Sequence, residues 1–437
     1  MEQKRVAIFS TFYTIDPSYS LNNVVEDQIS MFVNNGYSIV FLADEAFEPK
    51  GIYAHPMVIL RKLPKAQRDN YGNLNNDWKM ETGRMYEALK VHLADIDVVL
   101  AHDITLQCAH IVFNIASRRL AIERPDLLWI HWCHSATSPS IHCNIPEASE
   151  LIKPKFPNSV VAYPNDWDRP RVARNYHYEL DEVFCVHHPT DLAEYFGFHE
   201  LTRQLIKEKD LYSADVINVY PCRLDRGKQV EYNIRMMASV KRTGRDMRLI
   251  IMDFSSTGDD KLAYRETFYK RHGDGGLVEL AKSWGLEEKE ITFTSMWKPE
   301  TNYSCPRQMV KDLFLLSNIY IHPSTSETYS LVTQEAILCK NFCILNHHFP
   351  PMRSIYGDKN VLYEPFGSAV DALSGDNGST QLNIHDEEKH FLNLANKINY
   401  FIENNPVLAE HTFIRKFRNP DYVFKHEIEP LINRTKL

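Results

Sequence analysis

The sequence predicts an α/β protein with two doubly wound, Rossmann-like domains that face a central cleft. Three observations support this prediction. Short apolar runs typical of buried strands alternate with helical patterns along the chain. The alternation stops in a polar stretch near the middle of the chain and then starts again. At 437 residues, the chain is also too long for one ordinary hydrophobic core.

The first domain is predicted over residues 1–198. Its first strand, Val6–Ser10, is followed by a helical pattern over Asn23–Asn34, which Gly36 would end. Because the later apolar runs are short and nearly continuous, we expect parallel strands that are buried on both faces. These strands are predicted at Ser38–Leu42, Val98–Ala101, Leu127–Ile130, Val160–Tyr163 and Val183–Val186.

The second domain is predicted over residues 215–411, after a polar, charge-rich linker at 199–214. The alternation of strands and helices restarts there. Its strands are predicted at Val216–Tyr220, Leu249–Met252, Ile291–Phe293, Ile319–Ile321 and Phe342–Leu345. We expect the C-terminal segment, 412–437, to return and complete the first domain.

The composition narrows the class of protein. With 44% hydrophobic and 24% charged residues, the chain has the balance of a soluble globular protein. No apolar run is long enough to span a bilayer, and the N-terminus lacks the pattern of a secretory signal. The net charge of −8 argues against wholesale binding of nucleic acid. Its eight cysteines are scattered without a CxxC pair, which predicts reduced thiols in a cytoplasmic protein.

A cationic turn follows the first strand of the second domain. Arg223 and Lys228 come at the carboxyl end of Val216–Tyr220, and Gly227 permits a tight turn between them. Ligands of open α/β sheets bind at this end of the strands. Arginine offers phosphate a planar fork and lysine a point charge, so the turn could neutralise a diphosphate.

Two glutamates lie eight positions apart after a later strand of the same domain. Glu327 falls in a loop, and Glu335 falls inside a helix that we expect to begin near Ser330. Carboxylates accept hydrogen bonds from sugar hydroxyls, and a helix N-terminus attracts phosphate. The pattern therefore predicts a nucleotide-sugar site.

These two patterns resemble glycosyltransferase family 4, a family of retaining enzymes with the two-domain GT-B fold. The resemblance implies that Arg223 and Lys228 bind the donor diphosphate and stabilise it as it leaves. It implies that Glu327 lies beside the donor sugar and that Glu335 holds the ribose hydroxyls. Further donor contacts are implied for Thr294, Ser295, Tyr329, Ser330 and Leu331.

In the first domain the resemblance is looser. His134 falls at the end of a strand, where the family has a histidine that approaches the donor sugar, so it joins Glu327, Arg223 and Lys228 as a catalytic candidate. The family's glycine-rich loop is replaced here by Ser20–Asn23. Candidates for the acceptor side are Asn22, Asn23, Arg61, Lys62, Lys65, Arg68, His102 and Asp103.

We predict no metal and no resident cofactor. Asp95-Ile96-Asp97 and Asp166-Trp167-Asp168 resemble the metal-binding Asp-x-Asp of another glycosyltransferase fold. Here, however, Arg223 and Lys228 already supply positive charge for a diphosphate. The histidines and cysteines show no familiar four-ligand zinc spacing. The nucleoside-diphosphate sugar is a co-substrate, and a UDP-sugar is favoured only because it is common in the family.

The leading hypothesis is a retaining glycosyltransferase that acts on a saccharide or a lipid-linked glycan. The basic and aromatic segment from Arg61 to Trp78 keeps open a polyanionic acceptor, such as hydroxymethylated DNA bases. Two other hypotheses remain: a nucleotide-sugar epimerase or hydrolase, and a non-catalytic subunit that binds the sugar nucleotide. The sequence leaves the oligomeric state open.

Overall fold

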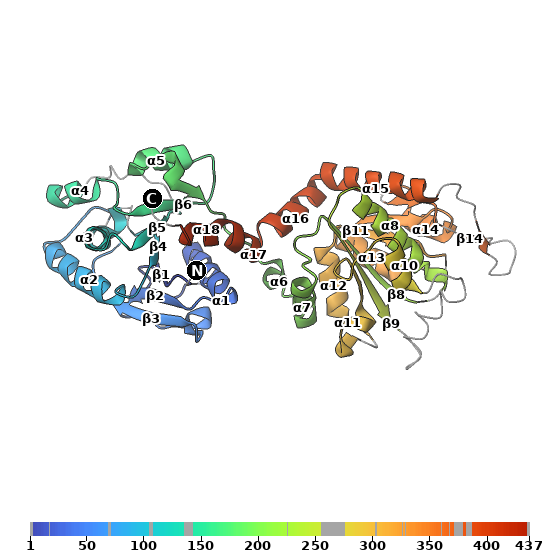
Figure 1. Ribbon diagram of the computed structural model, residues 1–437, viewed down its shortest axis with the longest axis horizontal. Coiled ribbons are helices and arrows are strands. Elements are labelled where there is room, and N and C mark those ends of the chain that lie inside the picture. The colour runs from blue at the N-terminus through green and yellow to red at the C-terminus, as the bar shows by residue number, and fades with distance from the viewer. Residues whose placement is uncertain are drawn as a thin grey trace. The chain divides into compact units, whose positions relative to one another are not determined.

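The computed structural model divides the chain into two compact units, Met1–Pro189 with Pro420–Leu437, and Thr190–Asn419 (Figure 1). Each unit is described by itself. The residues described are 3–16, 18–68, 71–104, 108–134, 143–224, 226–254, 276–301, 304–325, 327, 329–359, 361–366, 368–370, 379–381 and 387–434.

The first unit is built on a parallel sheet in the order β3-β2-β1-β4-β5-β6-β7. Every strand pair in this sheet is parallel. The strands are β1 (Val6–Phe9), β2 (Ile39–Asp44), β3 (Val58–Leu63), β4 (Val98–His102), β5 (Leu128–Trp132), β6 (Ser159–Tyr163) and β7 (Val183–Cys185).

Helices cover both faces of this sheet, because successive side chains of a strand point to opposite sides. Ala7 and Phe9 belong to a core cluster that includes residues of α2 (Trp78–His92) and α3 (Ile111–Glu123). Their neighbours Val6 and Ile8 belong to the opposite cluster. The remaining helices of the unit are α1 (Ser20–Asn34), α4 (Pro146–Ile152), α5 (Arg169–Tyr176), α17 (Pro420–Val423), α18 (Glu429–Ile432), the π-turn η7 (Phe424–Ile428), and the 3-10 turns η1 (Gly51–Ala54), η2 (Cys108–His110) and η3 (Leu180–Glu182).

The C-terminal segment of the chain packs against the first helix. The rings of Phe32, on α1, and Phe424 lie edge to face with centroids 5.3 Å apart. Val423 and Ile428 lie in the same buried cluster as Val25 of α1. Residues from the two ends of the sequence therefore share one core in the first unit.

The second unit has a parallel sheet in the order β10-β9-β8-β11-β12-β13. Numbered within the unit, this is the strand order 3-2-1-4-5-6 of a doubly wound nucleotide-binding fold. The strands are β8 (Val216–Arg223), β9 (Met247–Phe254), β10 (Ile291–Phe293), β11 (Ile319–His322), β12 (Phe342–Asn346) and β13 (Leu362–Glu364), with a separate antiparallel pair of β14 (Ser368–Val370) and β15 (Ser379–Gln381).

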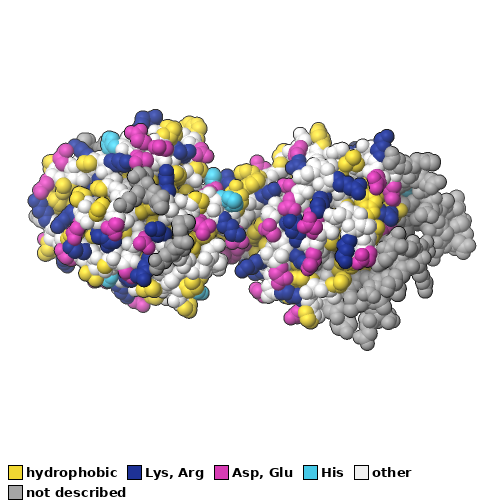
Figure 2. All heavy atoms as spheres, in the orientation of Figure 1, with side chains coloured by type: hydrophobic (Ala, Val, Ile, Leu, Met, Phe, Trp, Pro, Cys, Tyr) yellow, Lys and Arg dark blue, Asp and Glu magenta, His cyan; other side chains and the backbone are white. Residues whose placement is uncertain are grey.

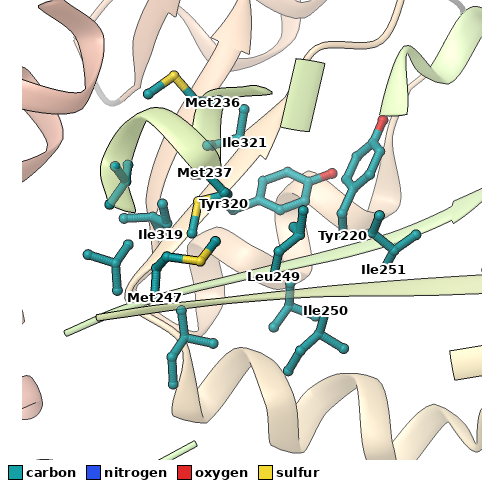
Figure 3. Packing of buried hydrophobic residues seen from close by; sticks show 14 of the residues in the cluster. Tyr220, Met236, Met237, Met247, Leu249, Ile250, Ile251, Ile319, Tyr320 and Ile321 are labelled. Atoms are coloured by element: carbon teal, nitrogen blue, oxygen red, sulfur yellow. The ribbon is translucent and has the colours of Figure 1, made fainter. Parts of the chain in front are cut away.

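One large apolar cluster forms the core of the second unit, and Figure 3 shows its centre. Met236 and Met237 of α8 (Val230–Arg242) pack there against strand residues such as Leu249 and Ile319. The other helices are α6 (Leu192–Tyr195), α7 (Glu200–Glu208), α10 (Leu277–Ser283), α11 (Thr294–Trp297), α12 (Arg307–Leu316), α13 (Leu331–Leu338), α14 (Pro350–Tyr356), α15 (Glu387–Asn404) and α16 (Pro406–Phe417), with the 3-10 turns η4 (Arg226–Lys228) and η6 (Pro299–Thr301).

The α/β class and the two doubly wound parallel sheets predicted from the sequence are confirmed. The structure draws the boundaries differently from the expected ones. Most of the expected linker, 199–214, is helix α7, whose Leu205 and Ile206 are buried in the second unit while Glu200 and Lys207 are exposed. The chain passes between the units at 189/190 and 419/420, so α16 lies in the second unit.

Candidate functional site

The site begins at the point where the strand order of the second sheet reverses. β8 and β11 are neighbours, and the chain continues from them toward opposite edges of the sheet. A crevice forms at the carboxyl ends of two such strands, and ligands of doubly wound folds bind there. The loops that leave these two ends carry the cationic turn and the first of the two glutamates.

Hydrogen bonds join the two loops into one structure. The carbonyl oxygen of Gly227 accepts from the Thr325 backbone N–H at 2.8 Å and from the Ser324 hydroxyl at 3.1 Å. Gln229, buried and in the left-handed region at φ 47°, donates its side-chain amide to the carbonyl oxygen of Pro323 at 2.8 Å. A backbone held in this unfavourable region requires support from its surroundings, which these bonds provide.

At the junction, the ammonium of Lys228 forms an ion pair and hydrogen bond with the carboxylate of Glu327. The side chains are only 12% and 17% exposed, respectively, so water screens the pair weakly. The Tyr220 hydroxyl fixes the backbone beside it by donating to the carbonyl oxygen of Lys228 at 2.8 Å. Figure 3 shows the rings of Tyr220 and Tyr320 on neighbouring strands, with both hydroxyls on the side away from Met247.

A histidine lies beneath Glu327. His322 ends β11 and is 2% exposed, and its Nε2 lies 3.4 Å from Glu327 Oε1. Its Nδ1 lies 2.9 Å from the Tyr320 hydroxyl. Burial, followed by the charge of Lys228, lowers the pKa of His322 to about 3, so the imidazole is neutral near pH 7. The contact with Glu327 is therefore one between a neutral ring and a carboxylate.

The expected helix after the loop is α13, which begins at Leu331. Ser330 precedes it in the left-handed region at φ 62°, and its hydroxyl lies 2.8 Å from that of Thr333. The Tyr356 hydroxyl donates to the carbonyl oxygen of Ser330 at 2.7 Å. Tyr329 and Leu331 have exposed side chains. The helix start predicted to hold phosphate is thus fixed by the polar side chains of Thr333 and Tyr356 around Ser330.

The other predicted donor contacts are placed less directly. Arg223 ends β8 with an exposed side chain, at the same carboxyl end of the strand that Lys228 follows. Glu335 lies within α13 and pairs with the exposed Arg307 at 3.5 Å. The structure therefore brings Lys228 and Glu327 into contact, whereas Glu335 has a partner on α12.

Thr294 and Ser295, predicted to lie beside the nucleotide base, are buried at the start of α11. The Ser295 backbone N–H donates to Asp253 Oδ1 at 2.9 Å, and its hydroxyl donates to Oδ2. The Thr294 hydroxyl lies 3.4 Å from Asp253 Oδ1. Their polar groups bind a buried carboxylate at the end of β9, so these two hydroxyls are engaged inside the second unit.

In the first unit, three histidines lie close together at the carboxyl ends of the strands. Rings of His102 and His134 stack with centroids 5.4 Å apart, and those of His134 and His188 also lie 5.4 Å apart. His102 Nε2 lies 2.8 Å from Gln28 Oε1, and its Nδ1 lies 3.1 Å from His134 Nε2. Burial, followed by the neighbouring His188, lowers the pKa of His134 to about 3. Asp103 accepts from the His134 backbone N–H at 2.9 Å.

The remaining acceptor-side candidates mostly have partners of their own. Asn22 is buried and donates to the carbonyl oxygen of Asp16, whereas Asn23 is exposed. Three of the four basic candidates are paired with acids. The pairs are Arg61 with Asp95 at 2.7 Å, Lys62 with Glu48 at 3.4 Å and Arg68 with Asp44 at 3.2 Å. Lys65 is exposed.

The surface charges are mixed rather than segregated. Figure 2 shows Lys and Arg side chains interspersed with Asp and Glu over the face in view. Among the residues that the structure describes, no group of three or more His, Cys, Asp or Glu side chains could hold a metal ion. Within the same part of the chain, no helix is both long and apolar enough to cross a membrane. The cysteines whose side chains are described are free thiols.

Sequence reasoning missed four residues of the site: Gln229, Asp253, Tyr320 and His322. For His322 a signal existed, since it ends a predicted strand just as His134 does. For Gln229 the signal was absent, because nothing in a sequence marks a glutamine that adopts a left-handed conformation.

No protein-family model matches the chain, and no curated protein matches it. Among solved structures, it is similar to a glycosyltransferase of Rickettsia africae, with 14% identity, 100% of both chains covered and a TM-score of 0.34. HepE of Anabaena in complex with UDP has 11% identity, with 98% of this chain and 99% of that chain covered and a TM-score of 0.35. Sucrose-phosphate synthase of Thermosynechococcus elongatus has 14% identity, the same coverage and a TM-score of 0.35. The first of these neighbours is named a glycosyltransferase, and the second was solved with UDP bound.

Proposed function

We propose that the protein is a retaining glycosyltransferase that moves a sugar from a nucleoside-diphosphate sugar to an acceptor hydroxyl. The observation that carries the proposal is the contact between Lys228 and Glu327 at the reversal point of the second sheet. A cation for the diphosphate and a carboxylate for the sugar hydroxyls adjoin there, next to the first turn of α13.

In the proposed reaction, the bond between the sugar's anomeric carbon and the diphosphate oxygen breaks, and a bond to the acceptor oxygen forms on the same face. The acceptor's proton passes to an oxygen of the departing diphosphate, so the step needs no separate protein base. Lys228 and Arg223 would stabilise the charge that develops on the leaving group. Glu327 would orient the sugar through its hydroxyls, and Glu335 would hold the ribose.

A saccharide or lipid-linked glycan is the acceptor that we propose. The pairing of Arg61, Lys62 and Arg68 with acids weakens the case for a polyanionic acceptor, because paired cations release few counterions to favour binding. The donor base, the part played by His134, the absence of a metal and a cytoplasmic location stay predictions from the sequence.

The test is product analysis with a panel of nucleoside-diphosphate sugars, with and without saccharide acceptors. The proposal predicts release of the nucleoside diphosphate that depends on an acceptor, and a product with the donor's anomeric configuration. Sugar that is released or isomerised without an acceptor would instead identify a hydrolase or an epimerase.

Variants tie the activity to the site. Lys228→Ala and Arg223→Ala should each lower turnover by about 10- to 1,000-fold, since each removes a charge that binds the developing anion. Lys282→Ala removes an exposed lysine of α10 that pairs with the exposed Glu279 at 2.9 Å, and should change little. Unchanged turnover in both Lys228→Ala and Arg223→Ala would contradict the assignment.

A further inference from the structure

The buried side of Glu327 is built from polar groups that the proposed chemistry has not used. Below it lies His322, and below His322 lies Tyr320, whose ring stacks on the imidazole with centroids 5.7 Å apart. The ring of Tyr220 meets the same imidazole edge to face at 6.0 Å. His322 is thus held between two fully buried aromatic rings, which fixes the plane of its imidazole.

The surroundings of His322 favour one of its two neutral tautomers. Its Nε2 faces the carboxylate of Glu327 at 3.4 Å, where an N–H would be attracted and a nitrogen lone pair repelled. Its Nδ1 lies 2.9 Å from the Tyr320 hydroxyl, which can donate to it. We therefore assign the single proton of the neutral ring to Nε2.

The Nε2–H of His322 is directed at the carboxylate of Glu327. Among the residues that the structure describes, Nε2 of His322 is buried without a hydrogen-bond partner, which is costly for a polar group. Glu327 Oε1 lies 3.4 Å away, slightly farther than an ordinary hydrogen bond, and is engaged by the ammonium of Lys228. An arriving diphosphate would compete for that ammonium and leave the carboxylate in need of a donor.

From this arrangement we propose that His322 is a positioning residue: its Nε2–H holds the carboxylate of Glu327 in place when an anionic ligand draws Lys228 away. The inference rests on the proposed function, because Glu327 needs a fixed position only if its carboxylate orients the donor sugar. His322 acts on the sugar only through that carboxylate. The Tyr320 hydroxyl, 2.9 Å from Nδ1, is placed to donate to the other nitrogen of the ring.

Two substitutions of His322 distinguish the roles of its two ring nitrogens. The amide of His322→Asn takes approximately the place of Nδ1 and keeps the contact with Tyr320. The amide of His322→Gln takes approximately the place of Nε2 and keeps a donor for Glu327. We expect His322→Asn to lower kcat by about 10- to 100-fold with a small change in KM for the donor, and His322→Gln to retain most of the activity. In a Glu327→Gln background, His322→Asn should cause little further loss. Equal losses in the two variants, or full additivity with Glu327→Gln, would overturn the proposal.

A second measurement uses no activity and so remains decisive if the proposed function fails. Nitrogen-15 NMR of histidine-labelled protein reports the tautomer of His322, assigned by comparison with His322→Gln. We expect the Nε2–H form in the wild type. In Lys228→Met, which removes the competing ammonium, the Nε2–H proton should move downfield as its bond to Glu327 shortens. An Nδ1–H tautomer, or an unmoved Nε2–H signal in Lys228→Met, would refute the positioning role whether or not sugar transfer is found.

Discussion

The ion pair of Lys228 and Glu327 yields a prediction that can be measured without any substrate. Replacing Lys228 by Met leaves the carboxylate of Glu327 mostly buried, without its cation and beside the neutral His322. Removing one partner of a fully buried pair costs about 3–5 kcal/mol. The side chains of Lys228 and Glu327 are still 12% and 17% exposed. We therefore expect a smaller loss of unfolding free energy than for a fully buried pair, about 2–3 kcal/mol.

The double variant isolates the interaction. With Lys228→Met and Glu327→Gln combined, no unpaired charge is left, so the loss should fall to about 1 kcal/mol. If Glu327→Gln alone costs about 1 kcal/mol, the coupling energy is about 2 kcal/mol. The pair of Lys62 and Glu48 is a matched control at 3.4 Å, but its side chains are 42% and 77% exposed. Its coupling energy should be about 0.5 kcal/mol or less.

Hydrogen exchange measured by mass spectrometry suits a protein of two units, because peptides from β8 and β11 report on the second unit alone. Peptides from β4, in the first unit, serve as the internal reference for the Lys228 and Glu327 variants. The control pair lies in the first unit, so for its variants the two sets of peptides exchange roles. A coupling energy for Lys228 and Glu327 no larger than that of the control pair would refute the view that their contact is a tight, poorly solvated one.

Three further predictions concern stability. The pKa values of His134 and His322 are lowered from 6.5 to about 3, so the unfolded chain takes up protons first as the pH falls below 6.5. Stability should therefore decline from pH 7 to pH 5, by about 2 kcal/mol per histidine at pH 5, in urea unfolding; stability that is constant over this range would contradict the neutral, buried state. Lys340 follows α13 in the left-handed region at φ 63°, so Lys340→Gly should raise the unfolding free energy by about 0.5–1 kcal/mol; a lower melting temperature would exclude this account. Asp253→Ala removes the acceptor for the backbone N–H and hydroxyl of Ser295 and should cost about 2–3 kcal/mol by thermal unfolding, whereas a loss below about 0.5 kcal/mol would show that water replaces the carboxylate.

Most of the fold could be predicted because parallel strands buried on both faces leave continuous apolar runs. Val6–Phe9 and Val98–His102 are examples. The sequence does not predict β3 and β13 of the two parallel sheets, nor the short antiparallel pair of β14 and β15. β3 and β13 lie at sheet edges, where one side of the strand is unpaired. Arg61 and Lys62 interrupt the apolar pattern of β3, so the sequence there indicates only a basic cluster.

The charged residues of the candidate site could be predicted from the sequence, but the residues that hold them in place could not. Lys228 and Glu327 each follow a predicted strand, and these two strands are neighbours in the sheet, where the side chains form an ion pair. The orientation of Thr294 and Ser295 depends on Asp253, about 40 positions earlier, and no local pattern reveals such a partner. The same holds for His322, whose role comes from the tyrosine rings packed around it.

The central claim is that Lys228 and the loop of Glu327 form a diphosphate site, and calorimetric titration tests it most directly. UDP, GDP and ADP would each be compared with the corresponding monophosphate. We predict that the wild type binds at least one diphosphate about tenfold or more tightly than its monophosphate, since a charge-assisted bond is worth about 1.5–3 kcal/mol. That ratio should collapse in Lys228→Met and persist in the control Lys282→Met. An equal ratio in wild type and Lys228→Met, or no preference for any diphosphate in the wild type, would contradict the claim.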